Sequence, residues 1–217
     1  TTSMRSKCQV SLKALVLCTG LAMLQGCGGG SDAPAPAAST ISGTAAAGAP
    51  VIGQVTVKDA NGLMRVKDIN ADGSYSVDVS GMTAPFVFRA SGTVGGRVVT
   101  LVSAATSDDI NHTINITPFT DLIVANMAGQ LASTYFDSPD FAALTPTELN
   151  AAKTTLTQRL LPLLSNVGLA SGFDLLRTAF AADHSGFDAV MDVVRVTVDP
   201  ATATAQIQDL VNNTLIT

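Results

Sequence analysis

The sequence has no tryptophan, two tyrosines, two histidines and three cysteines among its 217 residues, and only 13% of the residues are charged. So few aromatic rings leave little from which to build a sugar-stacking platform. The cysteines lack the Cys-x-x-Cys spacing of zinc and redox sites. Gly-rich phosphate loops and the Gly-x-Ser-x-Gly nucleophile motif are also missing. These absences argue against several large enzyme classes, and we expect neither a cofactor nor a metal ion.

The sequence also lacks an apolar run long enough to span a membrane. Its N-terminal run, from Ala14 to Leu24, is much shorter than the roughly 20 residues that a spanning helix needs. Arg5, Lys7 and Lys13 precede this run. A positive segment followed by a short apolar segment is typical of a secretory signal. We therefore assign residues 1–26 to a signal peptide.

The signal ends at Leu24-Gln25-Gly26-Cys27, which resembles the lipobox of bacterial lipoproteins. That resemblance implies cleavage before Cys27 and acylation of its thiol with fatty acids such as palmitate. Gly28 in place of aspartate implies sorting to the outer membrane. Residues 27–40 are rich in Gly, Ser, Ala and Pro and predict a flexible tether. The alternative is an ordinary signal peptide with an incidental cysteine.

The charge balance is acidic. The whole chain carries a net charge of −5. Removal of residues 1–26 would leave nine of the 12 basic residues against all 17 acidic ones, a net charge of about −8. Such a balance argues against nucleic acid as a partner. Contact with the membrane is then expected through the N-terminal lipid alone.

Residues 41–117 carry the pattern of short antiparallel strands. Val55 and Val57 alternate before a turn at Asn61-Gly62, and Tyr75, Val77 and Val79 alternate after a second turn at Asp72-Gly73. Both dipeptides favour tight hairpin turns. This stretch resembles the carboxypeptidase regulatory-like domain. The residues that carry the resemblance are Gly43, Gly48, Pro50, Val51, Val55, Val57, Asp72, Gly73, Tyr75 and Val77. The resemblance implies a small transthyretin-like β-sandwich that is a non-catalytic module.

The remaining chain changes from strand to helix and back. Residues 118–192 have helical spacing, with starts predicted at Thr117-Pro118, at Thr145-Pro146 and at Ser185, and a shorter helix over 173–181. Pro162 is expected to kink or end its helix. Residues 193–217 alternate again and predict a β-hairpin. The predicted class is α+β: a small antiparallel β-sandwich, a helical segment and a C-terminal β-hairpin, with two cores meeting near Thr117.

The C-terminal strands leave two alternatives open, because so few strands do not make a stable sheet alone. They pair with an edge of the sandwich, or they begin a further unit of a longer protein.

Two groups of residues are candidates for chemistry. Asp68, Asn70 and Asp72, followed by Gly73, match the first half of an EF-hand calcium loop, but Val79 stands where its glutamate is required. A turn that uses these side chains is the simpler interpretation.

The second group is Asp183, His184, Ser185, Asp188 and Asp192, which together contain acid–base and metal-ligating groups. Neighbours in sequence do not make a catalytic triad, since its members must converge from separate elements. A helix cap with a solvated acidic face is the simpler interpretation.

These observations predict a non-enzymatic envelope lipoprotein that acts as a structural or protein-interaction module, with an envelope protein as partner. The alternatives are the N-terminal part of an envelope enzyme and a small-ligand-binding lipoprotein. The sequence leaves the oligomeric state open.

Overall fold

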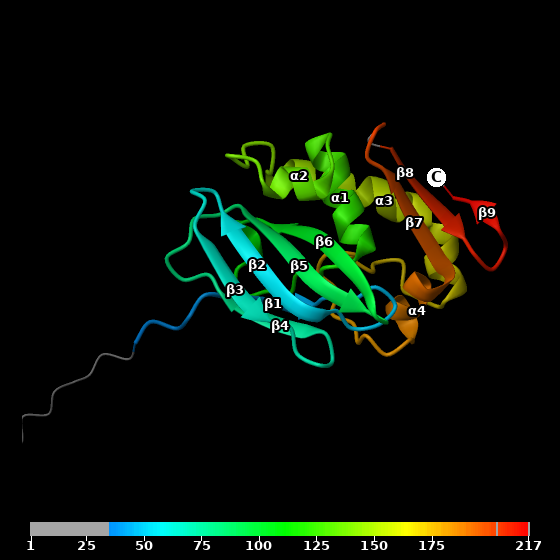
Figure 1. Cartoon of the computed structure of the whole chain (residues 1–217), viewed down its shortest axis with the longest axis horizontal. Helices are drawn as coiled ribbons and strands as arrows, with labels where there is room; N and C mark the ends of the chain where they lie inside the picture. Colours follow the sequence, from blue (N-terminus) through cyan, green and yellow to red (C-terminus); the bar gives the residue numbers. More distant parts are fainter. Residues whose placement is uncertain (1–34, 203, 217) are drawn as a thin grey trace, which may run out of the picture. The chain divides into compact units, whose positions relative to one another are not determined.

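The structure is a computed structural model that describes residues 35–202 and 204–216. From Ala37 onward the chain forms one compact unit (Figure 1). The strands are β1 (Thr40–Thr44), β2 (Ile52–Asp59), β3 (Met64–Asp68), β4 (Ser74–Asp78), β5 (Phe86–Val94), β6 (Arg97–Ala105), β7 (Val194–Asp199), β8 (Thr204–Asp209) and β9 (Thr214–Leu215). The helices are η1 (Ser107–Asp109), α1 (Pro118–Ala128), α2 (Ala132–Phe136), α3 (Pro146–Asn166) and α4 (Gly186–Val193). The predicted α+β class is confirmed.

The first six strands form two antiparallel sheets that face each other. One sheet has the order β3-β2-β5-β6, and the other pairs β1 with β4. Tyr75 and Val77 of β4 alternate as predicted and pack with Val57 and Phe88 of the larger sheet. We call this group of buried residues from 41–116 the sandwich cluster. The tight turns also lie where the sequence predicted them, since Gly62 and Gly73 both have positive φ.

Residues 112–117, the last part of the region in which the sequence predicts short strands, run beside β1 without forming a strand. Isolated parallel bridges join Ser42 to Thr113 and Ala45 to Ile116. Gly43 lies so close to the backbone of Ile114 that a Cβ atom at this position would collide with it. The glycine at the start of the predicted domain is therefore needed for a close approach of two backbones.

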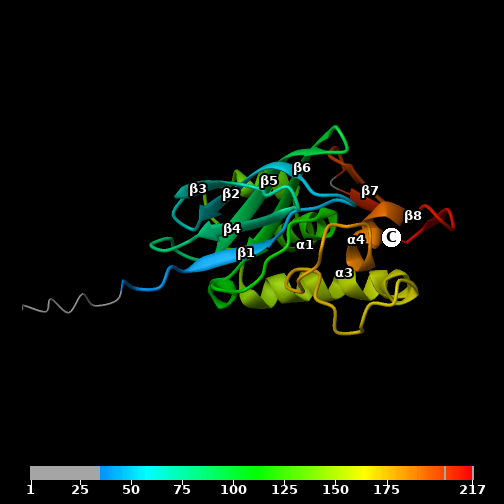
Figure 2. The same cartoon turned by 90° about the horizontal axis from the view of Figure 1, so that it is seen from below.

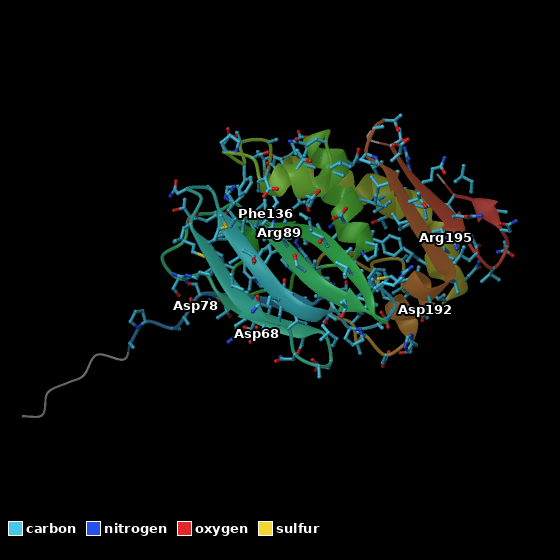
Figure 3. The ribbon with its side chains drawn as sticks, in the orientation of Figure 1. Asp68, Asp78, Arg89, Phe136, Asp192 and Arg195 are labelled. Atoms are coloured by element: carbon cyan, nitrogen blue, oxygen red, sulfur yellow. The ribbon has the colours of Figure 1, made fainter. Side chains whose placement is uncertain are left out.

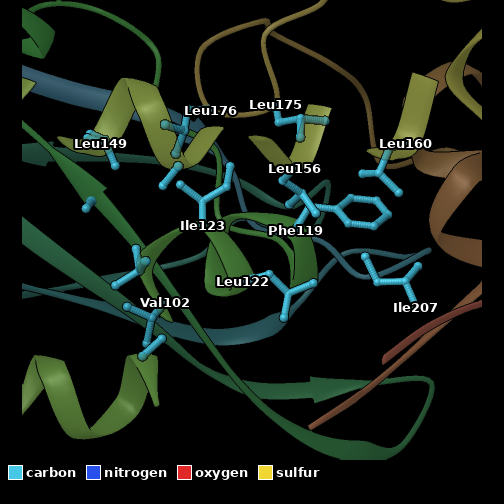
Figure 4. Packing of buried hydrophobic residues seen from close by; sticks show 14 of the residues in the cluster. Val102, Phe119, Leu122, Ile123, Leu149, Leu156, Leu160, Leu175, Leu176 and Ile207 are labelled. Atoms are coloured by element: carbon cyan, nitrogen blue, oxygen red, sulfur yellow. The ribbon is translucent and has the colours of Figure 1, made fainter. Parts of the chain in front are cut away.

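Helices α1 and α2 cover the second face of the larger sheet, and α3 packs on α1, so this unit has three layers (Figures 1 and 2). Val87, Val102 and Ala104 point from β5 and β6 into a second group of buried residues, which we call the helix cluster. Phe119, Leu149 and Leu160 from the helices and Ile207 of β8 are further members of it (Figure 4). Within the described part of the chain, no helix is long and apolar enough to cross a membrane.

The starts of α1 and α3 agree with the capping predictions. Thr117 caps α1, with its side chain accepting a hydrogen bond from the Thr120 N–H. Thr145 caps α3 in the same way through the Glu148 N–H at 3.2 Å. These bonds satisfy backbone donors that the first turn leaves without partners.

Of the two outcomes predicted for Pro162, a kink or the end of the helix, the end is wrong. The helix continues to Asn166, because Leu163 and Leu164 beyond the proline are buried in the helix cluster. Burial of two leucines offsets the hydrogen bond that the proline removes.

The predicted helix over 173–181 is also wrong. The Asp174 carboxylate accepts the N–H groups of Leu176 and Arg177, and its own N–H donates to the Thr178 hydroxyl. These local bonds give the backbone an alternative to the helical pattern.

The C-terminal strands form a separate sheet in the order β7-β8-β9. The predicted hairpin is present as β7 and β8, with β9 added as a short third strand. Among the described residues, no ladder joins this sheet to the sandwich, so the first of the two alternatives, pairing with a sandwich edge, is wrong. Val194 and Ile207 instead bury themselves in the helix cluster, which gives the sheet an apolar support.

Candidate binding cleft

The predicted site residues have separate places. Cys27 lies outside the described residues. In the predicted calcium loop, Asp68 accepts a hydrogen bond from Gln54, and Asp72 accepts bonds from the Ser74 N–H and hydroxyl. The Asn70 amide also donates to Ser74. The three side chains thus serve the hairpin, and no group of three or more acidic, histidine or cysteine side chains in the described ranges could hold a metal ion.

The structure does bring the second group together, at the start of α4. The His184 ring Nδ1 lies 2.8 Å from Asp192 Oδ2, and the His184 N–H donates to Asp188 Oδ2. The hydrogen bond and charge of Asp192 raise the pKa of His184, while burial raises the pKa of Asp188. Asp188 Oδ1 is buried and has no hydrogen-bond partner within the described chain.

This group is not arranged as a triad. The Ser185 hydroxyl donates to Asp183 Oδ1 at 2.6 Å, whereas a nucleophile would have to bond to the histidine ring. Ser185 is the cap residue of α4, but its side chain caps no helical N–H, contrary to the prediction. The group therefore fixes the start of α4.

A cleft of about 750 Å³ lies between β6 and β7. Its walls include Arg97 and Thr100 of β6, Asp121 of α1, and Asp192 and Arg195 at the junction of α4 and β7. Asp192 and Arg195 are labelled in Figure 3. Each of these two strands is an edge of its own sheet. The cleft thus has a strand edge on each side.

The edge of β6 is closed at one end by α1. The Val102 N–H donates to Asp121 Oδ1, and the Val102 carbonyl accepts the Thr120 hydroxyl, both at 2.9 Å. The backbone of Val102 therefore points away from β5. Side chains from the first turn of α1 take the place of a neighbouring strand.

The same edge is open two residues earlier. In an antiparallel ladder, residues alternate between pointing their backbone groups toward the partner strand and away from it. Because Val102 points away from β5, Thr100 and Val98 do so as well. Both side chains are exposed, and within the described residues no hydrogen bond satisfies these outward backbone groups.

The facing edge of β7 is also open, because its residues follow the same alternation of backbone direction. The Ile207 carbonyl accepts the Ile216 N–H, so Ile207 points toward β9. Its partner in β7 is Val196, which consequently points its backbone groups away from β8 and toward the free edge. Val194 and Val198 share that orientation. Two unpaired strand edges are a template for a further strand.

Asp121 connects the cleft to a second cavity. This cavity of about 320 Å³ lies between α1, α3 and β8, and Leu122, Leu156 and Ile207 form apolar parts of its wall. Asp121 and Val198 line both cavities. Burial raises the pKa of Asp121 to about 6, and the hydrogen bond from Val102 opposes this shift only in part. Asp121 is therefore a carboxylate in a position that disfavours its charge.

The other charged groups of the cleft differ from Asp121. Asp192 has the His184 ring beside it. Arg97 and Arg195 are exposed, and neither takes part in a salt bridge of the described residues. The exposed guanidinium groups keep their hydration, whereas Asp121 is half-buried and loses part of its hydration.

No known protein family, characterised protein or solved structure matches this chain.

Apart from Asp192, the residues that make the cleft are not predicted by the sequence. Asp121 carries the one available signal, as a lone acid within the apolar stretch Phe119–Val124. Arg97, Thr100 and Arg195 have no local signal, because their role depends on which strand becomes the edge of a sheet. Asp192 was in the predicted group, and the structure places it on both the His184 pair and the cleft wall.

Proposed function

We propose that this chain is a non-catalytic module of the bacterial cell envelope that binds another protein and is anchored through a lipid on Cys27. The observation that carries the binding role is the cleft with an open strand edge on each wall. Strand edges recognise extended peptides through main-chain hydrogen bonds. The N-terminal signal and lipobox resemblance support the anchor and an outer-membrane location.

A small-ligand-binding role is the second candidate. The cavity beside Asp121 has a volume of about 320 Å³, at the lower end of the roughly 300–1,000 Å³ range of ligand pockets. Its wall combines leucines with Asn126 and Gln130. The third alternative, part of an envelope enzyme, has less support, because Ser185 bonds to Asp183 rather than to His184.

Site-specific crosslinking in cells tests the binding role. A photo-crosslinking amino acid is placed at Thr100 on one wall and at Val196 on the other. The matched control position is Val66, an exposed side chain on β3 at the opposite edge of the larger sheet. We expect both cleft positions to trap the same envelope protein and Val66 to trap none. The same products from all three positions, or none from the cleft, would contradict the proposal.

The anchor has its own test, in the Cys27→Ser variant. Cell fractionation is expected to find the wild-type chain with the outer membrane and the variant as an unprocessed precursor. A variant that is processed and sorted like the wild type would show that Cys27 is incidental. This test is independent of the crosslinking, so location and binding can fail separately.

A further inference from the structure

We infer that the cleft takes an extended segment of a partner protein, which adds as a strand to the open edge of β6 and places one lysine or arginine side chain against Asp121. This inference rests on the proposed binding function and deepens it, because it names the conformation and the charge of the ligand. It draws on two independent features: the backbone of β6 and the carboxylate of α1.

The backbone of β6 defines how the segment binds. Thr100 and Val98 present their N–H and carbonyl groups to the cleft, and the pairing pattern stops at Val102, where Thr120 and Asp121 occupy the edge. A segment that pairs with Thr100 therefore passes directly beside Asp121. Side chains of an added strand alternate between the two faces, so one in two points to the side of the carboxylate.

The charge of Asp121 defines which side chain fits. Its Oδ1 atom accepts the Val102 N–H, and none of the salt bridges among the described residues includes it. The other carboxylate of the cleft, Asp192, already has an imidazole partner. A cation brought by the ligand would compensate the half-buried charge of Asp121. The stem of a lysine or arginine also suits Val198, an apolar side chain that lines both cavities.

The arginines of the cleft limit the positive charge of the bound segment to one central position. Arg97 and Arg195 are exposed on the walls. Basic residues on either side of the central lysine would meet these guanidinium groups, and like charges held close together are unfavourable. The expected ligand is therefore an extended segment with a single cation and neutral or acidic flanks.

Peptide binding to the purified chain tests the inference. The probe is a capped nine-residue peptide of alternating threonine and valine with a central lysine, carrying a fluorophore for anisotropy. Matched peptides replace the lysine by norleucine or glutamate, and a shifted peptide moves it by one position to the other face. Of the two lysine peptides, we expect the one with the better register to bind at least about tenfold more tightly than the norleucine peptide. The glutamate peptide is expected to bind most weakly.

Protein variants assign the effect to each feature. Asp121→Asn keeps an oxygen for the Val102 N–H and removes the charge, so it is expected to erase most of the difference between lysine and norleucine. Thr100→Pro removes an outward N–H without touching the bonds to β5, a position where edge strands tolerate proline. It is expected to abolish binding, whereas Thr100→Ala retains it. N-methylation of the peptide tests the same hydrogen bonds from the ligand side, should the proline variant not fold.

Several results would overturn the inference. Equal binding of the lysine and norleucine peptides, a difference that survives Asp121→Asn, or no binding of any peptide would each exclude it. Self-association of the chain that Asp121→Asn abolishes, measured by analytical ultracentrifugation, would assign the edge to a second copy instead. If Thr100 and Val196 still crosslink to an envelope protein when the peptides fail to bind as expected, the proposed binding function stands and only the inference about the ligand fails. The failure of the inference is therefore distinguishable from the failure of the proposed function.

Discussion

The sandwich cluster and the helix cluster use the larger sheet in different ways. Every member of the sandwich cluster comes from residues 41–116, so this core is complete within one stretch of chain. The helix cluster gathers α1 to α4 and the C-terminal sheet, and it also takes Val87, Val102 and Ala104 from the back of the sheet. The helices thus depend on the sandwich for part of their core, while the sandwich needs them only as a cover.

Separation of the two clusters is the strongest test of this asymmetry. Residues 41–117 alone are expected to give a β-rich circular dichroism spectrum and a cooperative melt, as the sequence predicts. Exposure of Val87, Val102 and Ala104 should cost roughly 4 kcal/mol and increase the binding of a hydrophobic dye. A fragment without a cooperative transition would mean that the helices are part of the sandwich core.

Cavities in the two cores are the next test. Phe88→Ala in the sandwich cluster and Phe119→Ala in the helix cluster each remove a fully buried ring. Each is expected to lower the free energy of unfolding by about 3–5 kcal/mol. Urea denaturation followed by separate probes in the two regions is the measurement. One shared transition in both variants would show that the clusters unfold together, while two transitions would show that they are independent.

An ion pair between the two regions provides a smaller test. Arg177 Nε lies 2.6 Å from Asp109 Oδ1 of η1, and Arg177 Nη1 donates to Asn150 of α3. Arg177→Met would leave Asp109, which is 2% exposed, without its cation and should cost about 2–4 kcal/mol. The double variant Arg177→Met, Asp109→Asn is expected to recover part of this loss. Equal melting temperatures for the single and double variants would contradict the coupling.

The pH dependence of Asp121 is the smallest expected effect. Its pKa of about 6 in the folded chain lies above the ordinary value of 3.8. The folded state therefore binds more protons than the unfolded state between these values, and stability falls as pH rises through about 4 to 6. Asp121→Asn should stabilise the chain by roughly 1–3 kcal/mol at pH 8 and very little at pH 4. An equal effect at both pH values, in urea denaturation, would exclude this account.

The sequence predicts local features of the fold well, because each depends on a few neighbouring residues. The turns at Gly62 and Gly73 and the caps at Thr117 and Thr145 follow from backbone conformation and hydrogen-bonding capacity. Where a local competitor or distant packing decides the outcome, the same reasoning fails. Asp174 replaces a predicted helix by a turn, and packed leucines carry α3 past Pro162.

The layer order and the cleft could not be predicted, for a related reason. The sequence of β6 is a nearly continuous apolar run, Val98–Ala105 broken by two polar residues, and its second half, Leu101–Ala105, is buried and contacts both clusters. A strand buried on both faces loses the alternation that identifies a face. The tertiary fold alone decides which strand forms the edge of the sheet. It also brings Asp121 to the backbone of that strand.

The cover that α1 gives to Val102 also affects how the chain folds. Thr120 and Asp121 reach the β6 edge only after the first turn of α1 has formed and docked. Until then the edge is unpaired from Val98 through Val102, in a stretch rich in valine. Unpaired edges of this kind join other chains edge to edge. Docking of α1 therefore shortens the unpaired edge to Val98 and Thr100 and competes with aggregation during folding, so the rate of this docking sets how long each new chain exposes the longer edge.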